Sequence, residues 1–323
     1  MQSHGARFGG PSARPESQEE APNAPCLTDQ PGSRGSLLRH HENEFFSNLP
    51  DGVVDMGEGP VEITPEVTAD LLSQSLALRQ ELRDLYRLLP ETRCRRRSLC
   101  CSLLPEMTLC EALTAVGQLA AMAPVVRMEV TIGFIRYFLM NSVELSSCPF
   151  LHGKDCRIYE ERFFGCRAYG LWSRARYESE TARSRQAKEV SRRQWEQLRV
   201  PLSRQVVEFH LPYCTHVEVM GGVEVNDGLI LEARDRLEAL SRRLGFWHEV
   251  FRANYFADLS FLLASSAFGL HQAVASKFYL VRDLVKTGGR GRLARLMEEA
   301  PMSAPGFSES RYFVCSLRLE RGR

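Results

Sequence analysis

Apolar residues recur with a helical period over most of the chain after residue 60. In the segment 61–90, leucines are spaced seven positions apart at Leu71, Leu78 and Leu85. Thr64 precedes the run and is a suitable N-cap, because its hydroxyl can accept from a backbone N–H of the first turn. The pattern predicts an amphipathic helix whose apolar stripe packs on the protein's own core. A short dimerisation seam is the alternative.

Further helices are predicted along the rest of the chain. Thr108 and Glu111 form a Thr-x-x-Glu capping box that opens one apolar helix, and a second is expected over 129–141. The segment 176–204 is charged and carries opposite charges four positions apart, as in a solvent-facing helix. The region 227–300 returns to helical patterning and is expected to hold three helices.

Short alternating runs predict a minor β component. The residues 217–225 alternate around a pair of glycines, so a β-hairpin is expected in the segment 205–226. The segment 301–323 is expected to be a tail, in which 311–319 alternates like a strand that pairs with the hairpin. The fold class predicted is mainly α, with a small cysteine-rich module framed by helices, a minor β-hairpin and a helical C-terminal region.

Composition sets the first 60 residues apart. Residues 1–60 hold 15 of the chain's 39 glycines and prolines, which predicts a disordered N-terminal tail. The first thirty residues contain no apolar run long enough for a signal peptide. The longest uncharged apolar stretch, 259–276, is diluted by polar residues and predicts a buried helix and no membrane segment. We therefore expect a cytoplasmic protein with reduced thiols.

Charge limits the classes of partner. The chain has 41 Lys and Arg against 40 Asp and Glu, so overall charge gives no argument for a nucleic-acid-binding protein. A local excess occurs over 157–204, with twelve basic and six acidic residues. A solvated helix face explains this excess, and a protein partner bound through the 64–89 or 171–204 helices is the alternative.

The cysteines carry the clearest chemistry. Seven of the ten lie between residues 94 and 166, in an expected module at 91–175. Clustered thiols in a reducing compartment are typical ligands of Zn²⁺ and of iron–sulfur clusters. The candidate metal ligands are Cys94, Cys100, Cys101, Cys148, Cys156 and Cys166. The preferred set combines the last three with one or both of Cys100 and Cys101, and Cys94 is the next candidate. Adjacent side chains point in different directions, so Cys100 and Cys101 rarely bind one tetrahedral ion together.

These cysteines resemble a known family pattern over about residues 91–172. The downstream residues Cys148-Pro-Phe-Leu, Cys156-Arg-Ile-Tyr-Glu and Cys166-Arg are similar to the signature of the YkgJ-like cysteine-cluster proteins. The upstream cysteines match that family's Cys-x-x-Cys-x-x-Cys-Cys motif, in which Arg97 stands at the second cysteine. Phe163 also replaces a usual proline. The resemblance implies a zinc- or iron-chelating domain.

The remaining cysteines give weaker signals. Cys110 lies inside the capped helix and is expected to pack in the core, and neither Cys26 nor Cys315 matches a motif. His210, Cys214 and His216 share one face of an extended segment. A structural role is preferred for these three, and a second metal site is the alternative.

The function predicted is metal binding, with the physiological role open. No phosphate loop, nucleophile elbow or His-Glu-x-x-His zinc motif occurs, so whether the protein is an enzyme also stays open. A resemblance to flagellin lysine methylases implies one alternative, an S-adenosylmethionine-dependent enzyme with an iron–sulfur cluster. The other alternative is an interaction or regulatory protein stabilised by a metal.

Overall fold

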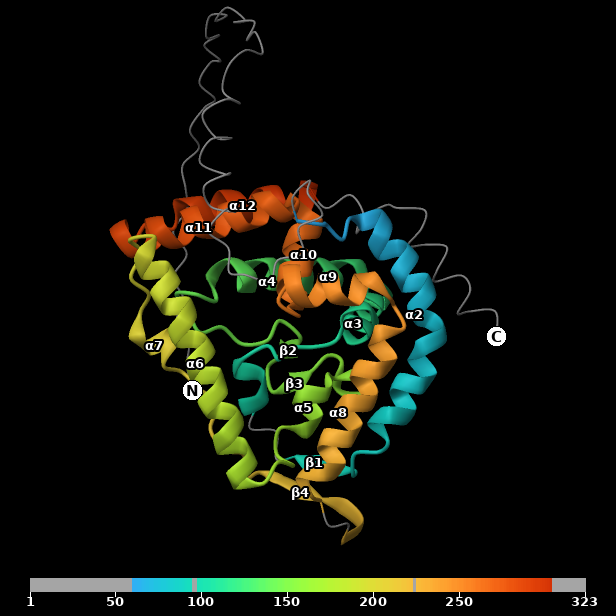
Figure 1. Cartoon of the computed structure of the whole chain (residues 1–323). Coiled ribbons are helices and arrows are strands. Elements are labelled where there is room, and N and C mark those ends of the chain that lie inside the picture. Colours follow the sequence, from blue (N-terminus) through green and yellow to red (C-terminus); the bar gives the residue numbers. More distant parts are fainter. Residues whose placement is uncertain (1–59, 95–97, 223–224, 304–323) are drawn as a thin grey trace, which may run out of the picture. The chain divides into compact units, whose positions relative to one another are not determined.

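The computed structural model describes residues 60–94, 98–222 and 225–303 (Figure 1). The predicted N-terminal tail before Pro60 and the predicted strand at 311–319 lie outside this part of the chain. So do Arg97 and the two residues that follow Gly222.

The described fold is mainly α, as predicted. The helices are α2 (Pro65–Tyr86), α3 (Leu109–Ala121), α4 (Pro124–Met140), α5 (Phe164–Ala168), α6 (Arg174–Gln197), α7 (Arg204–Val207), α8 (Asp227–Arg242), α9 (Phe246–Asn254), α10 (Leu259–Phe268), α11 (Leu270–Thr287) and α12 (Gly291–Ser303). The strands are β1 (Thr92–Cys94), β2 (Leu151–His152), β3 (Asp155–Cys156) and β4 (Val217–Val219), and single 3₁₀ turns form η1 (Leu99–Ser102), η2 (Tyr159–Glu161) and η3 (Met220–Gly222).

The leucine-rich helix α2 begins where its sequence signals place it. The Thr64 hydroxyl accepts from the backbone N–H of Val67, and a proline occupies the first helical position. Leu71, Leu78 and Leu82 are buried, and the helix packs against α3 and α8. The apolar stripe of this helix therefore lies in the core of the chain itself, as predicted.

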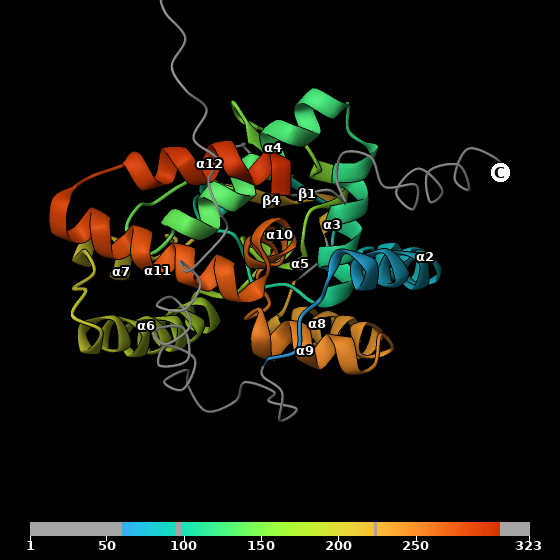
Figure 2. The ribbon, with the colours of Figure 1, turned by 90° about the horizontal axis from the view of Figure 1, so that it is seen from above.

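The central helices α3 and α4 are apolar on most sides. Both hydrogen bonds of the predicted capping box form between Thr108 and Glu111. Helix α4 begins at Pro124, earlier than the predicted start at 129, because a proline suits the first helical position after the extended Met122. Figure 2 shows α10 end-on near the centre, and α4, α11 and α12 all pack against it.

The prediction of a single helix over 259–276 is wrong, because the segment is divided between α10 and α11. Gly269 takes φ 83°, and the chain bends by 106° between α10 and α11. Gly245 (φ 62°) and Gly288 (φ 68°) interrupt the same region, so 227–300 holds α8 to α12 instead of three helices. Among the described residues no single helix has the length and composition of a membrane span, and only the bent α10–α11 pair meets that test.

A minor hairpin is formed by β2 and β3, whereas residues 223 and 224 of the hairpin predicted at 217–225 lie outside the described residues. Strands β2 and β3 pair antiparallel, with Leu151 opposite Cys156. The segment 205–226 does contain a strand, β4, but its partner is β1, with Cys94 opposite Val217. A three-residue strand gains its ladder from whichever strand the tertiary fold brings alongside it. This long-range pair brings the end of β1 next to the chain before β4.

Helix α6 has the predicted surface character. None of its residues is buried, and Glu189 pairs with both Arg192 and Arg193 along the helix. The helix ends at Gln197, short of the predicted 204, and Arg199 takes φ 59° just after it. Mutual pairing of these charges fits a solvated helix face.

Candidate metal centre

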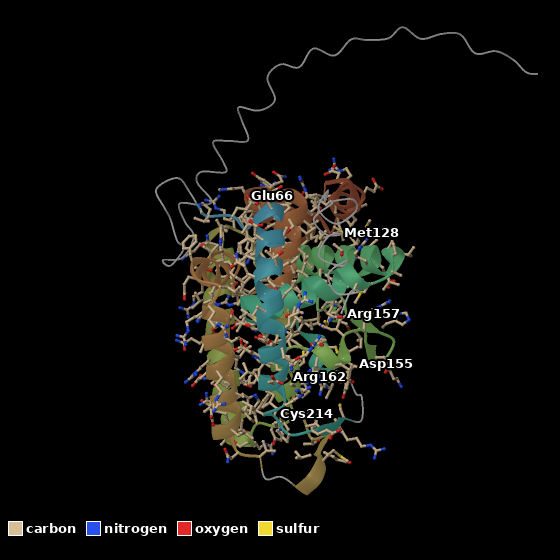
Figure 3. The ribbon with its side chains drawn as sticks, turned by 90° about the vertical axis from the view of Figure 1, so that its right-hand side faces the viewer. Glu66, Met128, Asp155, Arg157, Arg162 and Cys214 are labelled. Atoms are coloured by element: carbon tan, nitrogen blue, oxygen red, sulfur yellow. The ribbon has the colours of Figure 1, made fainter. Side chains whose placement is uncertain are left out.

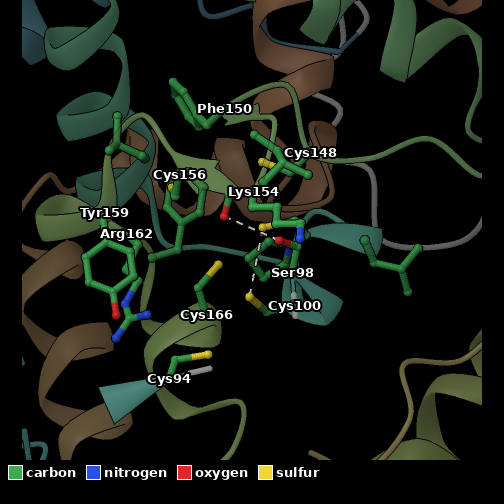
Figure 4. A pocket seen from close by; sticks show the side chains of 16 residues that line it. Cys94, Ser98, Cys100, Cys148, Phe150, Lys154, Cys156, Tyr159, Arg162 and Cys166 are labelled. Carbon is green, nitrogen blue, oxygen red and sulfur yellow. Dashed lines mark hydrogen bonds between the residues drawn. The ribbon is translucent and has the colours of Figure 1, made fainter. Parts of the chain in front are cut away.

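All six predicted ligands line one cavity of about 640 Å³ (Figure 4). They come from elements that are distant in sequence: Cys94 from β1, Cys100 and Cys101 from η1, Cys148 from the loop after α4, Cys156 from β3 and Cys166 from α5. Figure 1 shows these elements gathered between α6 and α8. The fold therefore brings the upstream and downstream cysteine groups together, as the sequence predicts.

A backbone hydrogen bond joins the two cysteine groups. The N–H of Cys148 donates to the carbonyl of Cys101 at 2.7 Å. The hairpin that follows is anchored by Phe150, which is fully buried and packs edge-on against Phe134 with centroids 4.9 Å apart. The loop that carries Cys148 is thus fixed on one side by the upstream group and on the other by α4.

The short helix α5 is attached to the core by a buried carboxylate. The Glu111 side chain accepts from the backbone N–H of Phe164 at 2.6 Å and from the Tyr86 hydroxyl at 2.9 Å. Burial raises the pKa of this carboxyl, and the same hydrogen bonds oppose that rise. Phe164 is the first residue of α5, so Glu111 satisfies an N–H that the helix leaves unpaired. The position of Cys166, two residues later, depends on this contact.

The electrostatics of the cavity favour the protonated forms of Cys148 and Cys166 when no cation is bound. Burial raises the pKa of Cys148 to about 12, with a further rise from Cys156 and Cys100. The pKa of Cys166 is raised well above its usual value, first by burial and then by negative charge on neighbouring sulfurs. A bound cation reverses this balance, because metal ligation favours the thiolate.

Cys100 and Cys101 lie close to each other. Their sulfurs lie 3.9 Å apart, so the 3₁₀ turn of η1 does not point them away from each other as expected. The hydrogen bond between them and, to a smaller extent, the charge of Arg162 lower the pKa of Cys100 to about 7, against the effect of burial. The same bond raises the pKa of Cys101. Cys100 is thus the thiol in this pair that ionises first.

The flanking arginines divide into two groups. Arg162 lines the cavity itself, and its guanidinium stacks over the Tyr159 ring with 4.3 Å to the centroid. Arg157 instead pairs with Glu129 at 3.1 Å, and Arg167 donates to backbone carbonyls of the loop before α5. Of these three, Arg162 is the cation that faces the sulfurs most directly.

The donor set fits a soft metal in its chemistry. Six thiols exceed the four that one tetrahedral site needs, and thiolates suit Zn²⁺ and iron–sulfur clusters. Within the described residues, however, no three Cys, His, Asp or Glu side chains have the mutual spacing of a closed metal site. Binding a metal therefore requires the cysteines to move toward one another.

A second cavity of about 410 Å³ adjoins the first. Cys94, Cys100 and Cys166 line both cavities, and Cys214 and His216 line only the second. The sequence grouped Cys214 and His216 with His210 and favoured a structural role for the three, but nothing in the pattern connected them to the main cysteines. The pairing of β4 with β1 makes that connection.

His210 does not line either of these two cavities. Its pKa is lowered by partial burial and by the charges of Lys188 and Arg185. The predicted grouping of His210 with Cys214 and His216 is therefore replaced by one of Cys214 and His216 with the main cysteines.

Comparison of the chain with protein-family models, with curated proteins and with solved structures gave no match. The resemblance to the YkgJ-like cysteine-cluster family thus rests on the residues of the motif alone.

Proposed function

We propose that this protein binds a thiophilic metal, as Zn²⁺ or as the iron of an iron–sulfur cluster, through its cysteine-rich module at 91–175. The observation that carries the proposal is the convergence of six cysteines from separate elements on one cavity. Cysteines that only fill a core have no reason to gather in this way, because any small apolar residue would serve. The similarity of the motif to a zinc- or iron-chelating family supports the same reading.

Cys148, Cys156 and Cys166 are the proposed ligands of the ion, together with Cys100 or Cys101. A closed site made of thiolates gives structural stabilisation with Zn²⁺ and electron transfer with an iron–sulfur cluster. The protein's own contribution is to desolvate the thiols and to place Arg162 beside them, where its charge offsets part of the negative charge of the ligands.

The proposal requires reduced thiols, and for this reason we place the protein in the cytoplasm. Cys100, Cys101, Cys148, Cys156 and Cys166 are all free thiols in the structure. Ligation of these thiols would couple the folding of the short elements around them to the presence of the metal.

Anaerobic purification followed by metal analysis and a visible absorption spectrum tests the proposal. Stoichiometric zinc without colour, or iron with acid-labile sulfide and broad charge-transfer bands, is the expected result. Cys148→Ser and Cys166→Ser should lose the metal. Cys110→Ser is the matched control and should retain it, because Cys110 is buried in α3 and lines neither cavity.

Purified protein that holds no metal and is nevertheless stably folded would contradict the proposal. The same conclusion follows if Cys148→Ser and Cys166→Ser bind as much metal as the unaltered chain does.

A further inference from the structure

The segment before β4, residues 209–216, is held across α5 and α6 by side-chain donors; we call it the strap. Its backbone carbonyls accept hydrogen bonds from side chains of the helical region: Tyr177 donates to Leu211, Tyr169 to Pro212 and Lys188 to Phe209. The strap in turn donates from the Tyr213 hydroxyl to the carbonyl of Trp172 at 3.3 Å. These contacts fix the backbone of the strap, and so they fix where Cys214 and His216 lie.

A glycine allows the end of the strap to approach α5 closely. A Cβ on Gly170 would lie 2.5 Å from Cγ2 of Val217 and 3.4 Å from the sulfur of Cys214. Val217 is also opposite Cys94 in the β1–β4 ladder. Three cysteines from distant parts of the chain, Cys94, Cys166 and Cys214, therefore meet around the second cavity. Figure 3 places Cys214 and Arg162 toward the end of α2 that lies opposite Glu66.

We propose that the second cavity holds a second soft metal ion, bound by Cys94, Cys100, Cys214 and His216. The proposal rests on the proposed function of the first cavity. Cys214 and His216 line only the second cavity, and Cys101, Cys148 and Cys156 line only the first. This assignment of ligands to the second ion leaves Cys101, Cys148, Cys156 and Cys166 for the first ion. The two sets are Cys₄ and Cys₃His, both of which are established tetrahedral zinc sets.

The division also gives the adjacent pair a role. Cys100 and Cys101 have sulfurs 3.9 Å apart, and Cys100 lines both cavities whereas Cys101 lines only the first. With one cysteine serving each ion, neither ion has to take two ligands from adjacent residues.

Zinc counting on the full-length protein tests the second site. The chain is loaded anaerobically with Zn²⁺ alone, freed of excess metal and assayed for zinc per chain. We expect two ions in the unaltered protein and one in Cys214→Ser. His216→Gln should retain the first ion and bind the second at least tenfold more weakly in a chelator competition. His210→Gln and Cys110→Ser are the matched controls, and both should hold two ions.

The failures of the two proposals are distinguishable. One ion per chain, unchanged by Cys214→Ser and His216→Gln but lost in Cys148→Ser, would overturn the second site and leave the proposed function intact. Two ions in every variant would overturn the assignment of Cys214 and His216. No zinc in any form, together with no iron and acid-labile sulfide in the anaerobically purified protein, would defeat the proposed function itself.

Folding is checked separately by far-ultraviolet circular dichroism of each variant. If Cys214→Ser loses its helical signal, His216→Gln decides the question, because its half-buried ring makes a smaller contribution to packing. Unweakened zinc binding by folded His216→Gln then overturns the proposal.

Discussion

The Glu111 carboxylate accepts a 2.6 Å hydrogen bond from the backbone N–H of Phe164. This contact links the capped start of α3 to the first residue of the helix that carries Cys166. One carboxylate therefore serves both as a capping-box residue and as the support of a proposed metal ligand. The sequence signals the first role only.

Replacing Glu111 by alanine should lower the free energy of unfolding by about 3 kcal/mol, because four buried donors lose their acceptor. The donors are the hydroxyls of Tyr86 and Thr108 and the backbone N–H groups of Thr108 and Phe164. Denaturant unfolding measures the change, and zinc affinity should fall with it. Glu81→Ala is the control: its ion pair with Arg243 is half exposed, so a loss below about 1 kcal/mol is expected. An equal loss of unfolding free energy in Glu111→Ala and Glu81→Ala would contradict the claim that the buried hydrogen bonds of Glu111 stabilise the fold more than an exposed ion pair does.

Stability should depend on alkaline pH through Cys110. Burial raises the pKa of this thiol to about 12 in the folded protein, whereas an unfolded cysteine titrates near 8.5. Above about pH 8.5 the unfolded state loses its proton and the folded state keeps it, so this group's contribution to stability is lost as pH rises toward 12. Between pH 8.5 and 10 the unaltered protein should lose about 2 kcal/mol more than Cys110→Ala does. Parallel pH profiles of the two proteins would contradict this expectation.

Gly170→Ala should destabilise the protein by about 1–3 kcal/mol, because the added Cβ meets the side chain of Val217 at 2.5 Å. Zinc in the second cavity should then be bound less tightly, because the added Cβ displaces the end of the strap that carries Cys214 and His216. A second substitution, Val217→Ala, should restore part of the lost stability, and a double-mutant cycle measures this coupling. Gly291→Ala is the control, since no atom lies within 4 Å of a Cβ at that position. Additive effects of the two substitutions would mean that the close approach does not matter.

Removal of metal should lower thermal stability. A ligand present at a thousand times its dissociation constant stabilises the folded state by about 4 kcal/mol, so a strong chelator should lower the melting temperature and zinc should restore it. The double variant Cys148→Ser/Cys166→Ser should gain less melting temperature on addition of zinc than the unaltered protein, because only the second proposed site remains intact. Calorimetry or a circular dichroism melt makes the comparison, and a zinc response as large as that of the unaltered protein would argue against these ligands.

Local chemistry made several elements predictable. The N-cap at Thr64 and the capping box of Thr108 and Glu111 depend on residues three or four positions apart, so the sequence alone determines where α2 and α3 begin. The spacing of Leu71 and Leu78 likewise predicts the buried face of α2. The motif picked out six cysteines that line one cavity.

The tertiary structure decided what depends on contacts between distant residues. Strand β4 pairs with β1, which lies more than a hundred residues away in the sequence. A strand of three residues gains too little from its own sequence to select a partner, so packing selects one. That choice brings Cys214 and His216 to the cysteine cluster. The thiols in the motif follow from the sequence, whereas their two additional neighbours follow only from the fold.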